Sequence, residues 1–133
     1  MAKKLMWPNF NVPIAKQAED FISLEIRNGW IENDEIRLYL RTGLRRIEGS
    51  TVKAVTIASV SVYERRKSRG IFTAILTEIE KIAANAGLSV FVENVLNSRL
   101  ADFFERRGYG ECKDRIPDIC FFYKPDSVES ING

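Results

Sequence analysis

The most constraining feature of this sequence is the segment Val62–Leu76, which predicts a strand end, a cationic loop, a glycine and then a helix. The loop before Gly70 holds four cations, which are Arg65, Arg66, Lys67 and Arg69. The first turn of a helix offers free backbone N–H groups and the positive end of the helix dipole, and glycine permits close approach of a ligand. A solvated run of charges would explain the arginines alone, but not their place at a strand–helix junction. The segment therefore favours binding of a phosphate or pyrophosphate.

Length and composition indicate a single globular domain over residues 1–133 with one core, since 45% of the residues are hydrophobic. No apolar run could cross a bilayer, and none follows Met1–Lys4 as in a signal peptide, so we expect a cytoplasmic protein without a membrane partner. Cys112 and Cys120 are expected to be free thiols, although a pairing across a hairpin would also fit. The net charge of +2 is too small to favour nucleic acid, which we expect to be an unlikely partner. Oligomeric state is not set by the sequence, and a homodimer is one option.

The absence of histidine excludes several classes of enzyme. Ser-His-Asp and Cys-His nucleophiles, HExxH metal sites and imidazole acid–base chemistry all require it. We expect no metal ion, because two cysteines are too few for a zinc site built from cysteine alone. Neither a GxxxxGK[ST] phosphate loop nor a GxGxxG fingerprint occurs. Any enzyme here must use carboxylates, tyrosines, cysteines or bound water.

Hydrophobic periodicity predicts the secondary structure. Residues 52–62 are apolar on both faces and predict a central strand, whereas residues 35–46 alternate and predict a strand with one solvated face. The other expected elements are helices over 14–28, 71–86 and from Asn97 or Ser98 to Gly108, and strands over 88–93 and 119–123. This order predicts a mixed α/β fold with helices packed on a central sheet.

Two of these segments resemble the GCN5-related N-acetyltransferases. The acetyl-CoA signature of that family is a hydrophobic strand end followed by Gln/Arg-x-x-Gly-x-Gly/Ala at the start of a helix, and Lys67–Phe72 stands at that place. Asn97 before a helix and Gly108-Tyr109 after it match a second element, so the similarity covers roughly Ile36–Tyr123. The resemblance implies a mixed, mostly antiparallel sheet, helices on both faces, and a splay between two parallel strands that receives acetyl-CoA.

The resemblance also implies a mechanism and a set of site residues. Acetyl-CoA is the co-substrate, and a primary amine attacks its thioester directly. The strand end would bind the pantetheine arm, and the first helical amides the pyrophosphate. The residues expected to bind acetyl-CoA are Val62, Lys67, Ser68, Arg69, Gly70, Ile71, Phe72, Thr73, Asn97 and Phe104. Asn97 would equally serve as a helix cap.

Three residues depart from the family pattern. Lys67 replaces Gln or Arg, which keeps the charge but loses the planar fork. Phe72 occupies the position of a small residue, so its ring must pack inward if the backbone is to approach a pyrophosphate. Phe104 stands where many members carry a tyrosine that acts as general acid, which raises the question of how the leaving thiolate is protonated.

Glu93 is the expected catalytic residue because it ends an apolar strand beside the splay, where a carboxylate suits a general base. The alternative is a glutamate that only reaches solvent; Glu64, among arginines, is the rival base. The sequence thus predicts an N-acetyltransferase whose acceptor is a primary amine on a small molecule or a protein. The alternative is a catalytically weak binding module of the same fold, whose basic loop contacts an acidic partner such as nucleic acid.

Overall fold

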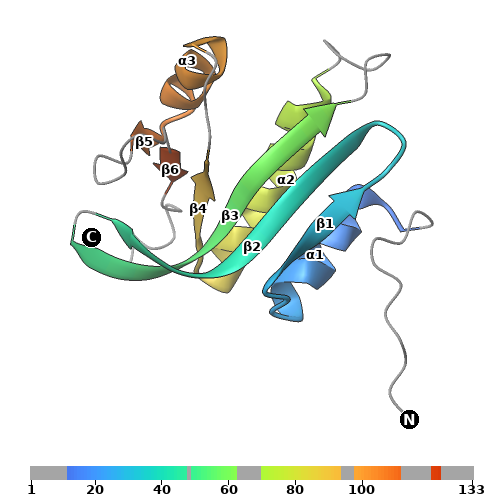
Figure 1. The fold of residues 1–133 in the computed structure, drawn as a ribbon, viewed down its shortest axis with the longest axis horizontal. Helices are drawn as coiled ribbons and strands as arrows, with labels where there is room; N and C mark the ends of the chain where they lie inside the picture. Colours follow the sequence, from blue (N-terminus) through green and yellow to red (C-terminus); the bar gives the residue numbers. More distant parts are fainter. Residues whose placement is uncertain (1–11, 48, 63–69, 94–97, 112–120, 124–133) are drawn as a thin grey trace.

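The computed structural model describes residues 12–47, 49–62, 70–93, 98–111 and 121–123, and Figure 1 shows their arrangement. In chain order the elements are α1 (Ile14–Ser23), β1 (Asn28–Glu32), β2 (Ile36–Ile47), β3 (Ser50–Val62), α2 (Ile71–Ala86), β4 (Ser89–Val92), α3 (Ser98–Arg106), β5 (Gly110–Glu111) and β6 (Phe121–Tyr123). Among these residues, no helix is both long enough and apolar enough to cross a membrane.

The described strands form one sheet in the order β1-β2-β3-β4-β6-β5. Only β3 and β4 run parallel, and the other four neighbouring pairs are antiparallel. The predicted mixed, mostly antiparallel sheet is therefore confirmed. β3 lies between β2 and β4, and its residues Ala54–Ile57 are all buried, as expected for a strand that is apolar on both faces.

The two parallel strands share only a short pairing. Residues Ala54–Ile57 of β3 lie opposite Ser89–Val92 of β4. β3 then continues for five residues to Val62, paired there with β2 and with no described residue of β4. A register shift that leaves Ala58 without a partner on β2 marks the same point, and such a bulge increases the local twist. An edge of β3 beyond Ile57 that pairs with no described residue of β4 is the geometry that the expected splay requires.

The helices gather on one face of the sheet. α1 and α2 pack side by side behind β1–β3 in the view of Figure 1. α3 is held against α2 by Glu80, which accepts hydrogen bonds from the Arg107 guanidinium at 2.8 Å and from the Tyr109 hydroxyl at 2.7 Å. The core lies between helices and sheet, and its fully buried members include Phe21, Ile31, Leu38, Leu40, Ile57, Leu76, Ile79 and Phe104.

The opposite face of β1–β3 differs from its prediction. The sequence predicts helices on both faces of the sheet, but none of the described helices packs on this one. The side chains that β2 presents there include Arg37, Tyr39 and Arg41, whereas Leu38 and Leu40 point into the core. A helix would have little apolar surface to bury against such residues. This face of β1–β3 is called the open face below.

The segment after α1 also differs from its prediction. Instead of a helix to residue 28, α1 ends at Ser23, and the chain forms β1, a strand that the sequence does not predict. The N–H of Ile26 donates to the carbonyl of Phe21, and Glu25 has a left-handed φ of 55°. These features form a Schellman motif, which ends a helix, although glycine is the usual residue at the left-handed position.

Gln17 connects α1 to β1. Its buried side-chain amide donates to the carbonyl of Glu32 at 2.9 Å and accepts from the N–H of Glu32 at 3.0 Å. It also donates to the carbonyl of Val12 at 2.9 Å. A buried amide is tolerated when it is hydrogen-bonded in this way, so Gln17 fixes the helix against the first strand of the sheet.

Candidate active site

The start of α2 is the first component of the site. Gly70 is the N-cap, is exposed and has a left-handed φ of 68°. A Cβ at Gly70 would meet no other atom within 4 Å, so the left-handed φ, rather than crowding by the protein, requires glycine there. No acidic side chain lies in the first turn, and Gly70 has no side chain to cap it. No described side chain therefore caps the first N–H groups of this 16-residue helix, which are the groups that would donate to an anion.

The three residues after Gly70 divide between the core and the surface. Ile71 and Phe72 are half-buried and pack against the core, whereas Thr73 is exposed. The Phe72 ring lies 6.1 Å from the rings of both Phe103 and Phe104. Phe72 thus packs inward, which is the condition under which a large residue at this position leaves the backbone accessible.

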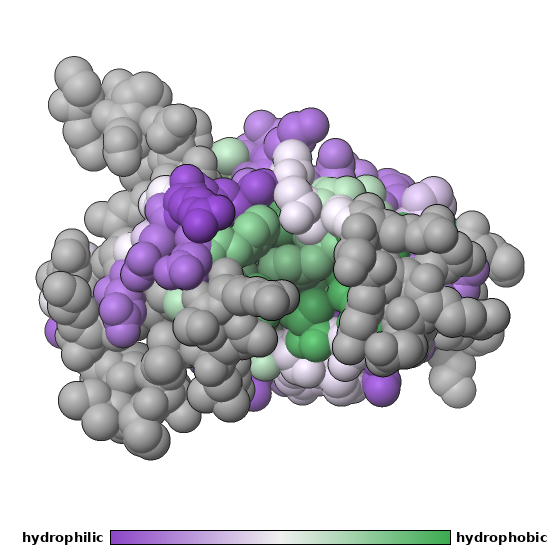
Figure 2. All heavy atoms as spheres, turned by 90° about the horizontal axis from the view of Figure 1, so that it is seen from above, coloured by the Kyte–Doolittle hydropathy of each residue, from purple (hydrophilic) through white to green (hydrophobic). Residues whose placement is uncertain are grey.

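Apolar residues gather in a hollow at this end of the molecule, which Figure 2 views from above. A cavity of about 310 Å³ lies beside the start of α2, on the side of α1 and β2. Its lining includes Ile14, Ile36, Gly70, Ile71 and Ile75. The lining also contains Glu35 and Glu78, so the α2 start adjoins a mixed wall of apolar side chains and carboxylates on this side.

The splay is the second component. Val62, at the end of β3, is half-buried and packs on the core. The N–H of Glu93 donates to the carbonyl of Ile57 at 3.0 Å, and this is the last described contact between the two parallel strands. Four predicted site residues lie outside the described residues: Lys67, Ser68, Arg69 and Asn97. The rival base Glu64 and both cysteines lie outside them too.

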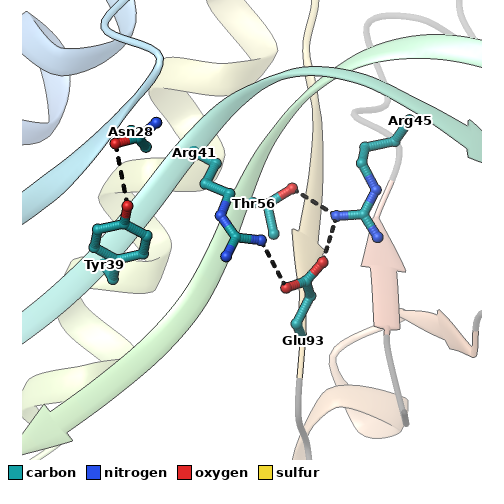
Figure 3. A network of polar contacts seen from close by, with 6 residues as sticks. All are labelled: Asn28, Tyr39, Arg41, Arg45, Thr56 and Glu93. Carbon is teal, nitrogen blue, oxygen red and sulfur yellow. Dashed lines mark hydrogen bonds and ion pairs between the residues drawn. The ribbon is translucent and has the colours of Figure 1, made fainter. Parts of the chain in front are cut away.

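Glu93 lies in a polar cluster instead of the apolar setting that the sequence predicts (Figure 3). Its carboxylate accepts from Arg45 at 2.8 Å and from Arg41 at 3.3 Å. Arg45 also donates to the Thr56 hydroxyl at 3.0 Å and stacks on the Phe91 ring, 4.3 Å from its centroid. The Glu93 and Arg45 side chains are 12% and 17% exposed, against 52% for Arg41. The expectation of apolar surroundings is wrong because β2 brings two guanidinium groups to the end of β4.

The sequence analysis does not identify Arg41 and Arg45 as partners of Glu93, although their spacing indicates that they share a face of the strand. Arg37, Arg41 and Arg45 are separated by four residues, and even spacing in a strand places side chains on one face. The alternation in residues 35–46 predicts that this face is solvated. The alternation does not predict the register between β2 and β3, which pairs Arg41 with Thr56 and so places Arg41 next to the splay.

Phe104 belongs to a buried aromatic cluster. It is fully buried, with its ring 5.2 Å from that of Phe103 and 5.0 Å from that of Tyr109. The Tyr109 hydroxyl donates to Glu80, and the hydroxyl of Tyr39 donates to Asn28 at 3.1 Å. Among the phenols whose side chains the structure describes, both are thus engaged with protein acceptors. In the part of the chain that the structure describes, no three metal-ligating side chains lie close enough together to hold a metal ion.

Comparison with known proteins identifies the fold. No family model matches the chain, and no curated protein matches it. Solved structures do: the KacTA–DNA complex aligns at 18% identity and a TM-score of 0.57, covering 74% of this chain and 63% of that chain. AtaT complexed with acetyl-methionyl-tRNAfMet aligns at 14% identity and a TM-score of 0.60, covering 76% and 68%. A mutant AtaT toxin bound to the C-terminus of the antitoxin AtaR and acetyl-CoA aligns at 17% identity and 0.55, covering 75% and 64%.

These likenesses confirm the expected fold, that of the GCN5-related N-acetyltransferases. The chain spans less than two thirds of the length of the first of these neighbours. The expectation that nucleic acid is an unlikely partner is wrong, because structures with this fold include a complex with DNA and a complex with tRNA. Net charge misled because it sums the whole surface, whereas nucleic acid responds to local clusters of cations.

Proposed function

We propose that this protein is an acetyl-CoA-dependent N-acetyltransferase. The observation that carries the proposal is the edge of β3 beyond Ile57, which pairs with no described residue of β4 and leads to an α2 start at Gly70 that no described side chain caps. An elongated ligand with a pyrophosphate fits this pair of features: backbone groups of β3 would bind its amide-containing arm, and the first-turn N–H groups its phosphates. Two neighbours of the same fold are bound to acetyl-CoA, which supports the choice of ligand.

In this function the amine nitrogen of the acceptor attacks the thioester carbonyl carbon. A C–N bond forms, the C–S bond breaks, the amine loses one proton, and the departing thiolate takes up one. Val62 and Gly70–Thr73 would position the co-substrate, with Lys67, Ser68, Arg69 and Asn97 as further proposed contacts. Phe104 would contribute apolar packing and no proton, so the thiolate would be protonated by water or by another group.

The described surroundings of the splay favour an acceptor that needs little help from a base. Glu93 is the proposed base, yet both of its carboxylate oxygens already accept hydrogen bonds from arginine, which restricts how an amine can approach them. The pKa of an α-amino group is about 7.7–8.0, against about 10.4 for lysine. A much larger fraction of an α-amine is therefore neutral and nucleophilic near pH 7.5. We take an α-amino group as the acceptor.

A structure of one neighbour supports a choice of carrier for that amine. AtaT has been solved with acetyl-methionyl-tRNAfMet, in which an amino acid is attached to RNA. The α-amino group of an aminoacyl-tRNA is accordingly the first acceptor to test, with peptide N-termini and lysine side chains as comparisons.

A thiol-release assay with acetyl-CoA tests the proposal. We expect CoA release with aminoacyl-tRNA, little with a lysine peptide blocked at its N-terminus, and loss of release in Gly70→Glu. A protein that binds acetyl-CoA in calorimetry but releases no thiol with any acceptor would instead be a binding module. The absence of a hydroxyl at Phe104 is the observation that favours this second candidate.

A further inference from the structure

The open face carries a strip of arginine and aromatic side chains. Trp30 of β1 is paired with Tyr39 of β2, and Arg37 and Arg41 lie two residues to either side of that tyrosine on the same face. These four residues are called the arginine–aromatic strip. They come from adjacent strands whose other faces hold buried Ile31, Leu38 and Leu40, so the strip is rigidly supported from behind.

The side chains of the strip stack on one another. The Arg37 guanidinium lies 3.9 Å from the centroid of the Trp30 ring. The rings of Trp30 and Tyr39 are 5.0 Å apart, and Arg41 lies 5.7 Å from the centroid of Tyr39. An arginine stacked on a ring keeps its planar group in a fixed orientation, with donors left over for a phosphate and a flat surface for a base.

The charge that reaches solvent on this strip is positive. Arg37 and Arg41 are 43% and 52% exposed, whereas the carboxylates that pair with them, Glu32 and Glu93, are 19% and 12% exposed. Arg37 lies 3.8 Å from Glu32, too far for a hydrogen bond. Ser59 and Ser61 of β3, which are paired with Tyr39 and Arg37 of β2, are exposed as well. A partner approaching from solvent meets guanidinium groups and hydroxyls before it meets the acids.

The strip leads to the splay. Arg41 is paired with Thr56, one residue before the last described contact of β3 with β4 at Ile57. α2, whose start would bind the pyrophosphate, lies behind the sheet in Figure 1, whereas the strip residues lie on the face opposite to the buried Leu38 and Leu40. A ligand on the strip would therefore reach the splay from the side opposite to the pyrophosphate, so the two need not compete for space.

We propose that the arginine–aromatic strip docks the single-stranded end of an RNA, and that the acceptor amine reaches the splay from this side of the sheet. The inference rests on the proposed transfer function only for the second of these statements. RNA is the occupant because its unpaired bases stack on aromatic rings and guanidinium planes while its phosphates pair with arginine. An acidic protein segment would satisfy the charges but leave the stacked rings without a role.

Fluorescence anisotropy with a labelled RNA hairpin that ends in an unpaired 3′ overhang tests docking without acetyl-CoA. We expect Arg37→Gln and Trp30→Leu each to weaken binding at least about fivefold, and Arg37→Gln to reduce the slope of log K against log salt by about 0.7. The matched control is Arg46→Gln: it removes the same charge from an exposed arginine on the same strand, but on the other face, and should change affinity less than about twofold. Thermal melts verify folding, and Arg37→Lys, which keeps the charge without the plane, should bind with intermediate affinity.

Three results would overturn the docking site: no binding of the hairpin at low salt, equal weakening by Arg37→Gln and Arg46→Gln, or binding of polyglutamate in place of RNA. Acetyl-CoA affinity and thiol release with a small α-amine are measured separately on the same variants. A natural protein that binds acetyl-CoA and releases thiol but does not bind the hairpin refutes the strip and leaves the transferase. Strip-dependent docking without thiol release supports the strip and refutes the transferase.

Discussion

The pair formed by Glu93 and Arg45 allows a sharp test of what Glu93 does. Both side chains are largely shielded from solvent, and their hydrogen bond is 2.8 Å long. Removing the charge by Glu93→Gln takes one anionic partner away from Arg45, which also stacks on Phe91. Because a buried group that loses a charged partner costs more than an exposed one, we expect Glu93→Gln to lower the free energy of unfolding by about 2–3 kcal/mol.

A double-mutant cycle measures the interaction itself. For Glu93→Gln and Arg45→Gln we expect a coupling energy of about 1–3 kcal/mol, since the residues touch and are mostly buried. Arg41 provides the control, because it binds the same carboxylate at 3.3 Å with 52% of its side chain exposed. Its coupling should be only about 0.2–1 kcal/mol. Urea denaturation of the single and double variants gives both values.

The activity of the same variants decides between positioning and catalysis. If Glu93 is a general base, Glu93→Gln should slow thiol release near pH 7 and lose less at higher pH, where the amine is already neutral. If Glu93 holds the two arginines in place, the rate should fall by a similar factor at every pH, and Arg45→Gln should show the same pattern. Coupling energies that are equal for Arg41 and Arg45 would refute the reasoning from burial.

Three other residues give simpler predictions. Gly70→Glu should weaken acetyl-CoA binding in calorimetry at least tenfold, about 1.4 kcal/mol, and should lower stability by about 1–2 kcal/mol because of the left-handed φ; unchanged affinity would remove the α2 start from the site. Gln17→Leu should cost about 1–3 kcal/mol in urea denaturation, because the N–H and C=O of Glu32 would lose their partner; an unchanged midpoint would mean that water replaces the amide. Phe104→Tyr should lower stability by about 1–3 kcal/mol by burying a hydroxyl, with thiol release changing little; a gain of orders of magnitude would show that the natural protein lacks its acid.

Much of the fold could be predicted because its longer helices and strands have clear patterns in their own local sequence. α2 begins and ends at glycines with φ of 68° and 73°, as the stripe of apolar residues and Gly87 predict. β3 is apolar on both faces and is central. β1 could not be predicted, because its position depends on the end of α1 at Ser23, which is followed by a non-glycine residue, Glu25, in the left-handed conformation. Its five residues are also too few for a periodic signal.

The parts of the site that are local in sequence could likewise be predicted, and the parts that depend on strand register could not. Gly70 and the strand before it are contiguous in sequence, so the anion-ready junction could be found from local pattern alone. The partners of Glu93 could not, since Arg41 and Arg45 lie 52 and 48 residues away from it and reach it only through the register of β2, β3 and β4. From the sequence, the surroundings of Glu93 are expected to be apolar because the preceding residues of its own strand are apolar. The partners of Glu93 come instead from β2, which is separated from β4 by β3.

The function that can be proposed for the open face depends on β1, the strand that the sequence does not predict. Without β1, the polar side of β2 is an ordinary edge, and Arg37, Tyr39 and Arg41 are solvent-exposed residues that need no explanation. With β1 in place, Trp30 comes opposite Tyr39 and beneath Arg37, and separate polar residues become a stacked surface. The two acids nearby lie deeper than the arginines, so a chain with a net charge of only +2 still presents cations to a partner at this place. Charge summed over a sequence therefore cannot exclude a polyanionic partner when the fold sorts acids inward and arginines outward.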